Sequence, residues 1–566
     1  LEVIDWIAAQ DWCTGDVGMM GISWGGFNGL QVAARRPEPL KAVITLCSTD
    51  DRYADDIHYK GGCVINENLG WSGTMLSYSS RPPDPVLVGD KWRELWLERL
   101  EAEPFLAAHW LQHQHRDGYW KHGSVCEDFP AIDAAVLAVG GWNDAYSNAI
   151  PRLVNGLAPR ARGIIGPWAH KYPHFAVPEP RIGFLQEALR WWDHWLKGED
   201  TGVSEDPAIR AYIMDSIKPD NLPANWPGRW IGDTWPCATT SVAELCLTPH
   251  GLRREPAGKA VMEICSPQTT GLDGGEYCVI WLGPEFPGDQ ARDDVGSLTF
   301  DAEVLNEDID IVGAIECELA FTADRPVAFV AVRANDVHPG GAVTRITYAI
   351  RNLCHRDSHE TPEPLQPGET YTVRIKLDDI AWRMPAGHKL RLSISTTYWP
   401  LMWPAPEPVT LTLMLGDCRL LVPVRQRPAQ DKAPDFSEAV ASPALQQEEL
   451  RAPSHIRRSG TGEDGRLQME IVDDFGAYRN LDHGLVDASI ARETYSILPD
   501  DPLSARATTH WTQEYARDGW QVRTEAYSEM TASLGHFHLT ARIEAYEGDE
   551  RIFAKSWDET IERKLA

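Results

Sequence analysis

Residues 16–46 hold the feature that most constrains the fold of this chain. The apolar run DVGMMGI at 16–22 is typical of a buried parallel strand, and residues 25–36 have the spacing of a helix. A second buried strand, LKAVITL, follows at 40–46. A strand, a helix and a strand in this order form a βαβ unit, which requires a parallel sheet. We therefore expect an α/β fold in the first part of the chain.

The sequence GISWG at 21–25 lies where the first of these strands passes into the helix. It fits the pattern G-x-S-x-G, in which a serine sits on a sharp turn between a strand and a helix. Such a turn leaves little room for neighbouring side chains, and Gly26 adds further clearance. The pattern predicts Ser23 as a nucleophile. The alternative is an ordinary glycine-rich loop.

A serine hydroxyl needs a base to remove its proton, and two later strand ends offer the partners. Asp144 follows the apolar run at 134–139, and His170 follows the run at 162–165. The carboxyl ends of parallel strands lie at one edge of a sheet, which is where such sheets place their sites. We expect Asp144 to orient His170, and His170 to act first as base and then as acid toward Ser23.

Different interpretations of these residues stay open at this point. Asp144 could instead cap the helix that follows it. Asp133 is a rival acid, but it precedes its strand, and His174 lies further from its strand end than the preferred histidine. His113 and His115 lack a third ligand at a suitable spacing, so we expect a surface or lid role and no metal.

The pattern of apolar residues divides the chain into three expected parts. Residues 1–205 form the α/β domain, with a helical cap inserted at about 50–130. Residues 206–450 form a β-sandwich of the jelly-roll type, with a linker at 426–457, and residues 451–566 form a small antiparallel β domain. Strands of the β-sandwich are expected at residues 277–282, 311–321, 327–332, 344–350, 371–377, 390–395 and 409–415.

Composition excludes several classes of partner. The formal net charge of -30 argues against nucleic acid, and no apolar run is long enough to span a membrane. The 11 cysteines form no C-x-x-C pair, which argues against a disulfide framework and a zinc site. We expect a cytoplasmic protein with reduced thiols and no cofactor or metal, acting on a small molecule. A homo-oligomer stays possible.

Tryptophans and aspartates supply candidates for a substrate pocket. The chain has 23 tryptophans, most of which must pack in cores, and Trp71, Trp142 and Trp168 are the candidates for the pocket wall. The acidic stretch at 50–56 follows a strand end and could hold the free amine of a peptide substrate. The alternative for this stretch is a solvated acidic loop.

The position of Ser23 near the start of the sequence carries a further expectation. A serine of this kind normally follows several strands, so we expect that the first strands of the domain, roughly 70–100 residues, are missing. The backbone N–H of Trp24 would be one oxyanion donor, and the second would come from an upstream loop. Loss of one such donor costs about 10²–10³ in rate in other enzymes, so we expect weak activity and an uncovered sheet edge.

Several segments together resemble the cocaine-esterase and X-prolyl dipeptidyl-peptidase family of serine hydrolases. The matching segments, in order, lie at residues 5–26, 111–125, 139–147, 163–172, 191–198, 289–333 and 384–395. The resemblance covers about residues 1–425 and implies Ser23, Asp144 and His170 as the catalytic residues. It also implies a helical cap, a jelly roll that closes one side of the pocket, and a second oxyanion donor from an upstream tyrosine.

These observations predict a serine hydrolase that cleaves an ester or an amide through an acyl-enzyme. An aminopeptidase of the X-prolyl dipeptidyl-peptidase type is the first alternative. From a different class, a catalytically impaired fragment could act as a β-sandwich binding protein.

Overall fold

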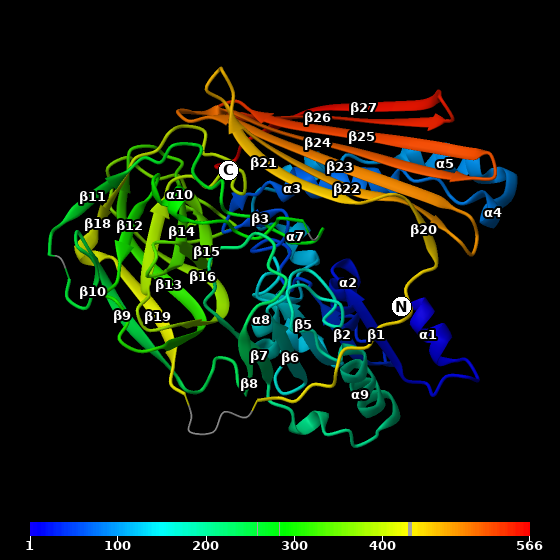
Figure 1. Cartoon of the computed structure of the whole chain (residues 1–566), viewed down its shortest axis with the longest axis horizontal. Helices are drawn as coiled ribbons and strands as arrows, with labels where there is room; N and C mark the ends of the chain where they lie inside the picture. Colours follow the sequence, from blue (N-terminus) through cyan, green and yellow to red (C-terminus); the bar gives the residue numbers. More distant parts are fainter. Residues whose placement is uncertain (257, 282, 428–432) are drawn as a thin grey trace.

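The computed structural model describes residues 1–256, 258–281, 283–427 and 433–566 (Figure 1). Its first part is a parallel sheet whose strands are, in spatial order, β1 (Val17–Ile22), β2 (Leu40–Leu46), β5 (Ala135–Gly141), β6 (Ala161–Gly166) and β7 (Ile209–Asp215). The strands are short apolar runs because helices cover both faces of this sheet. The parallel sheet predicted from the βαβ pattern is therefore present.

Helices on the two faces of the sheet belong to separate cores. Leu30 of α2 (Trp24–Ala33) and Leu153 of α8 (Ala149–Gly156) pack in one core, and Trp191 of α9 (Phe184–Lys197) packs in the other. A further helix, α1 (Glu2–Ala8), precedes β1. Because these crossover helices are held against the sheet, the carboxyl ends of the strands are fixed at one edge.

The connection from β2 to β5 is mostly helical and forms an insertion between these two strands. Its helices are α3 (Glu67–Ser79), α4 (Pro85–Val88), α5 (Trp92–Ala102), α6 (Leu106–Leu111) and α7 (Gly118–His122). A short hairpin, β3 (Tyr59–Lys60) and β4 (Cys63–Val64), precedes them. Among the described residues, each helix is too short or too polar to cross a membrane.

The second part of the chain consists mainly of strands and extends the same sheet. β8 (Gly228–Asp233) pairs with β7, and the sheet continues through β16 (Tyr371–Met384), β13 (Ile309–Ala323), β19 (Arg419–Arg425), β9 (Thr240–Thr248) and β10 (Gly251–Arg253). β11 (Val261–Ile264) and β18 (Leu411–Met414) pair beside β13, and α10 (Ala291–Asp294) is a short helix. A second sheet has the order β12 (Leu298–Asp301), β17 (Lys389–Ser395), β14 (Phe329–Val337) and β15 (Val343–Asn352). Both sheets contribute to one core.

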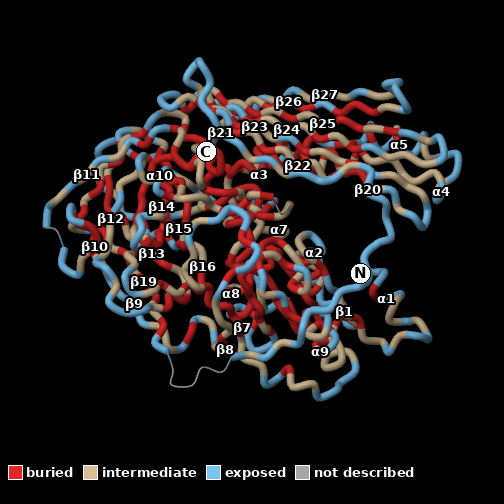
Figure 2. Tube along the Cα trace, in the orientation of Figure 1, coloured by how far each residue is buried: buried red, intermediate tan, exposed pale blue. Residues whose placement is uncertain are grey.

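The third part is an antiparallel sheet that lies over the helical insertion (Figure 1). Its strands are β20 (Gln447–Arg451), β21 (Ser454–Thr461), β22 (Leu467–Asn480), β23 (Val486–Leu498), β24 (Asp501–Arg517), β25 (Trp520–Ala532), β26 (His536–Glu547) and β27 (Glu550–Glu562). Trp511 and Leu539 of this sheet share one core with Leu76 of α3 and Trp96 of α5. Figure 2 shows buried segments along the sheet above these helices. The sheet and the insertion therefore bury one another.

Two expected features differ from the structure. Residues 277–281 are a loop, not a strand, and residue 282 lies outside the described residues. The backbone N–H groups of Ile280 and Trp281 donate to the Glu285 carboxylate instead of to a neighbouring strand. The expected linker at 426–457 contains β20 and the start of β21, because β22 supplies a pairing partner that overrides their polar composition.

Candidate active site

The turn from β1 to α2 places Ser23 in an unusual backbone conformation. Its φ is 57° and its ψ is -118°, in a region that costs a non-glycine residue about 1–3 kcal/mol. A Cβ atom on Gly21 would overlap the carbonyl carbon of Gly25, and one on Gly26 would lie 2.7 Å from Cβ of Ser48. Glycine is therefore required at 21 and 26, while position 25 faces open space.

His170 and Asp144 form a buried hydrogen-bonded pair. His170 Nδ1 lies 2.9 Å from Asp144 Oδ1, and the two residues are 4% and 5% exposed. A carboxylate at Nδ1 fixes the ring orientation and leaves Nε2 as the other nitrogen available for proton transfer. The acid and the histidine that the sequence predicted are therefore in contact.

Backbone contacts between two loops hold this pair in place. The Trp142 N–H donates to the Gly166 carbonyl at 2.9 Å, and the Asn143 N–H donates to the Trp168 carbonyl at 3.2 Å. A Cβ atom on Gly141 would overlap the same Trp168 oxygen, so only glycine allows this approach. The loops after β5 and β6 thus form one unit.

The loop at 277–281 supports His170 from the other side. The His170 N–H donates to the Val279 carbonyl at 3.0 Å, and Lys171 Nζ donates to the Ile280 carbonyl at 2.6 Å. This contact comes from the second part of the chain, well after the α/β strands. Sequence patterns did not reveal it because the stretch resembles a strand.

Ser23 and His170 line the same cavity, which has a volume of about 410 Å³. Most of its other lining side chains are aromatic or aliphatic: Ile22, Trp24, Trp71, Tyr78, Tyr172, Phe175, Ile280 and Trp281, with Gly25 and Lys171 completing the wall. Within the described residues, no hydrogen bond joins the Ser23 hydroxyl to His170. Such bonds are often long in ligand-free enzymes and tighten when substrate binds.

Cys47 is a residue of this site that our sequence reasoning did not select. It follows β2 and is buried, and one donor atom from each of Cys47, Asp144 and His170 lies within 4.8 Å of the other two. Burial and the Asp144 carboxylate raise the pKa of the Cys47 thiol well above its ordinary value, so the thiol stays neutral. The strand-end rule that selected Asp144 and His170 would also have selected this cysteine.

The three tryptophan candidates have different surroundings. Trp71 lines the cavity, and its ring lies 5.7 Å from the ring of Trp24. Trp142 and Trp168 are absent from the cavity wall in the described structure. Both are buried in cores, and their indole N–H groups donate to the carbonyl oxygens of Tyr212 and Pro180 at 2.7 Å. Trp142 also lines a second cavity beside Asp144, and the assignment of these two tryptophans to the substrate pocket stays a prediction.

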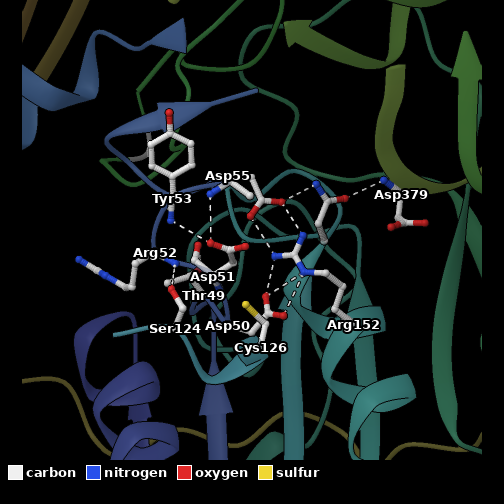
Figure 3. Close-up of polar contacts among 12 residues, drawn as sticks. Thr49, Asp50, Asp51, Arg52, Tyr53, Asp55, Ser124, Cys126, Arg152 and Asp379 are labelled. Atoms are coloured by element: carbon white, nitrogen blue, oxygen red, sulfur yellow. Dashed lines mark hydrogen bonds and ion pairs between the residues drawn. The ribbon is translucent and has the colours of Figure 1, made fainter. Parts of the chain in front are cut away.

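The aspartates at 50–56 form ion pairs with arginines, and Figure 3 shows Arg152 between Asp50 and Asp55. Arg152 of α8 donates to Asp50 at 2.5 Å and to Asp55 at 2.7 Å, and Arg52 forms an ion pair with Asp56 at 2.9 Å. Burial opposes ionisation of Asp55, but the charge and hydrogen bonds of Arg152 outweigh it and lower its pKa to about 2. These carboxylates are structural and do not line the cavity with Ser23.

The remaining candidate acid and histidines also have defined contacts. Asp133 lies at the surface, where Arg36 and Arg160 form ion pairs with it at 3.4 Å and 3.1 Å. The His174 ring stacks on Phe184 at 5.8 Å. The two histidines at 113 and 115 make contacts typical of structural residues, to the Asp117 carboxylate at 2.7 Å and to the residue 564 carbonyl at 3.0 Å.

Comparisons with known proteins agree with this architecture. Residues 1–172 match the family model described as X-Pro dipeptidyl-peptidase (S15 family), and residues 201–438 match the model described as X-Pro dipeptidyl-peptidase C-terminal non-catalytic domain. Cocaine esterase from Rhodococcus sp. (strain MB1 Bresler) is 23% identical over 448 residues, which cover 70% of this chain and 76% of that protein.

Two solved structures share the fold. An α-amino acid ester hydrolase labelled with selenomethionine superposes with a TM-score of 0.57 at 18% identity, covering 75% of this chain and 79% of that one. A CocE/NonD family hydrolase from Staphylococcus aureus superposes with a TM-score of 0.57 at 15% identity, covering 75% and 74%. The fold is therefore that of an α/β-hydrolase with a C-terminal β domain.

The two family models match successive parts of the chain, in the order in which the structure forms its α/β and β parts. The chain belongs to the X-Pro dipeptidyl-peptidase (S15) family, whose members and relatives are hydrolases, cocaine esterase among them.

Proposed function

We propose that the chain is a serine hydrolase in which Ser23 attacks an ester or amide carbonyl. His170 takes the hydroxyl proton and then gives it to the leaving group, and Asp144 keeps the imidazole in the required orientation. The observation that carries this proposal is that His170, whose Nδ1 lies 2.9 Å from the Asp144 carboxylate, lines the same cavity as a serine on a strained turn. Water then releases the acyl group from Ser23 with the same histidine as base.

The backbone N–H of Trp24 is our candidate for one oxyanion donor. Trp24 begins α2, so its N–H is among the groups at the start of the helix that have no partner within the helix. The partial positive charge at this end favours the negative oxygen of a tetrahedral intermediate. A second donor is not assigned.

The chemistry of the cavity favours a neutral, apolar acyl group. Its wall is mostly aromatic, and in the described part of the chain no Asp or Glu lines it. An ammonium group of a peptide substrate would be buried there without a carboxylate and beside Lys171. An uncharged aromatic or aliphatic ester would instead gain contact with Trp71 and Trp281. We therefore favour esterase over aminopeptidase action.

A substrate panel separates the two activities. We expect p-nitrophenyl esters of apolar acids to be hydrolysed with a higher kcat/KM than X-Pro p-nitroanilides. Ser23→Ala should abolish both activities, and it serves as the control for background hydrolysis.

The aminopeptidase remains the second candidate because both family models carry the X-Pro dipeptidyl-peptidase description. A higher kcat/KM for X-Pro anilides, lost in Ser23→Ala, would support it and reject our preference. Turnover of esters that persists unchanged in Ser23→Ala would reject the proposed nucleophile.

A further inference from the structure

Two histidines and an aspartate meet at the end of a sheet in the second part of the chain. Asp336 is the penultimate residue of β14, His338 follows that strand directly, and His388 directly precedes β17. β14 and β17 are antiparallel neighbours, with Val337 opposite Lys389. The next residues outward are therefore the two histidines, whose ring centroids lie 4.6 Å apart. None of the three residues belongs to the cavity of Ser23.

The donor atoms of these side chains converge. One donor atom from each of Asp336, His338 and His388 lies within 4.8 Å of the other two. Asp336 is fully buried and His338 is 7% exposed. Donor atoms that each bind one metal ion at about 2.0–2.2 Å are also less than 4.8 Å from one another. Only small side-chain movements therefore separate the observed arrangement from a ligand set.

Hydrogen bonds fix the His338 ring in the form that binds metals. His338 Nε2 lies 2.9 Å from Thr344 Oγ1, and the Thr344 hydroxyl donates its single hydrogen to the Ile217 carbonyl at 2.6 Å. The hydroxyl oxygen must therefore accept from Nε2, which carries the ring hydrogen of the neutral imidazole. The lone pair is then on Nδ1, and a partner on the second nitrogen is what orients histidine ligands in metal sites.

Two hydrogen bonds hold the Asp336 carboxylate beside the histidine rings. Asp336 Oδ1 lies 2.7 Å from His388 Nδ1, and the Trp382 indole N–H donates to Asp336 Oδ2 at 3.4 Å. A buried carboxylate supplies the negative charge that a divalent cation needs. Lys218 is the nearby positive charge that acts against binding.

We propose that Asp336, His338 and His388 bind one divalent transition-metal ion, with Zn²⁺ as the best fit. Two imidazoles and one carboxylate are a set typical of Zn²⁺, which completes four-coordination with water. The sequence predicted no metal, because these ligands come from strands far apart in the chain. The site would join β14 to the turn before β17 and, through Thr344, to the segment at Ile217. We therefore assign it a stabilising role.

The test uses the full chain without a histidine tag, after treatment with a chelator. Isothermal titration with Zn²⁺ should show one equivalent bound, and Co²⁺ should give the visible absorption of a low-symmetry site. Zn²⁺ should also raise Tm, since a ligand that binds only the folded state stabilises it. His338→Gln should weaken binding at least about 10-fold and remove the Tm increase. The matched control, His250→Gln, changes an exposed histidine. It should leave the affinity for Zn²⁺ and the Tm increase unchanged.

A second variant covers the case in which His338→Gln folds poorly. Thr344→Val keeps all three ligands but removes the acceptor that fixes the His338 tautomer, so it should bind Zn²⁺ more weakly than the unmodified chain. The proposal is wrong if the unmodified chain binds less than one equivalent of Zn²⁺. It is also wrong if His338→Gln, Thr344→Val and His250→Gln all bind it equally well. Neither result depends on hydrolase activity.

Discussion

Arg152 forms ion pairs with two buried aspartates. Asp50 is fully buried and Asp55 nearly so, and both carboxylates accept hydrogen bonds from the same guanidinium (Figure 3). Sequence alone presents these aspartates as free carboxylates after a strand end. The arginine that neutralises them is about a hundred positions further along the chain, on α8.

Arg152→Ala should destabilise the protein strongly. Removing one partner of a buried ion pair leaves an uncompensated charge, and this typically costs about 3–5 kcal/mol. Arg152→Lys keeps the charge but loses the two-pronged contact, so a smaller loss is expected. Chemical denaturation measures the free energy of unfolding of both variants. Equal stability of Arg152→Ala and the unmodified chain would show that the aspartates are not held as described.

Trp71 should affect substrate binding, whereas Trp96 should affect stability. Trp71 lines the cavity, so Trp71→Ala should raise KM for aromatic esters by about 10-fold through lost apolar contact. Trp96 is fully buried and donates to the Ser80 carbonyl at 2.7 Å. Trp96→Phe should lower the free energy of unfolding by about 1–3 kcal/mol with little change in KM. The reverse pattern would contradict the assigned cavity.

At the scale of elements, the sequence predicts the α/β part better than the contacts that complete the site. β1, β2, β5 and β6 are mostly apolar runs, and glycines lie at or near the ends of β1, β5 and β6. The positions of these strands, and the choice of Ser23, Asp144 and His170 after β1, β5 and β6, therefore follow from local patterns. The loop at 277–281 does not, because it alternates like a strand while its N–H groups bind the Glu285 side chain. Such side-chain pairing leaves no local pattern.

The helical insertion meets the C-terminal sheet through a pair of half-buried glutamates. Glu67 of α3 and Glu493 of β23 each place a carboxylate oxygen within 3.5 Å of the point where a Cβ atom on Gly70 would lie. Burial and mutual repulsion raise the pKa of Glu67 to about 8, and burial raises the pKa of Glu493 to about 7. Glu285, Asp473 and Arg457 are the other charged groups that act on this pair.

This pair should make stability depend on pH. A carboxyl whose pKa is raised by folding stabilises the folded state most at low pH, and this contribution is lost as the pH rises toward about 8. Between about pH 6 and pH 9 we expect Tm to fall. Glu493→Gln, which cannot ionise, should make this fall shallower, and Glu514→Gln at an exposed position of β24 should not. Thermal unfolding across this range provides the measurement, and parallel curves for all three proteins would contradict the assignment.

On the scale of the whole molecule, the C-terminal sheet connects to the cavity. Trp511 of β24 lies 5.9 Å from Trp281 and 5.8 Å from Tyr78, measured between ring centroids, and both of these residues line the cavity. Gln513 Nε2 also donates to Ser77 Oγ of α3 at 3.0 Å. The strand pattern predicted this sheet as a separate small domain and gave no indication that it shares a core with the helical insertion.

Trp511→Ala should therefore act on both stability and catalysis. Loss of a buried tryptophan costs about 3–5 kcal/mol, and collapse around the vacancy should move Trp281 and raise KM. Trp557→Ala provides a comparison, because Trp557 packs on Phe105 at 6.2 Å and does not line the cavity. A KM that is unchanged in Trp511→Ala would show that the sheet stabilises the molecule without shaping the cavity.

The most direct measurement is the site and rate of modification by a fluorophosphonate, which reacts only with an activated serine. After digestion, mass spectrometry should locate the label on Ser23. Asp144→Asn should slow labelling by about 10⁴-fold, since an asparagine amide can hold His170 in the tautomer whose Nε2 carries a hydrogen and cannot take the serine proton. Labelling elsewhere, or folded protein whose Ser23 reacts no faster than in Asp144→Asn, would contradict the account.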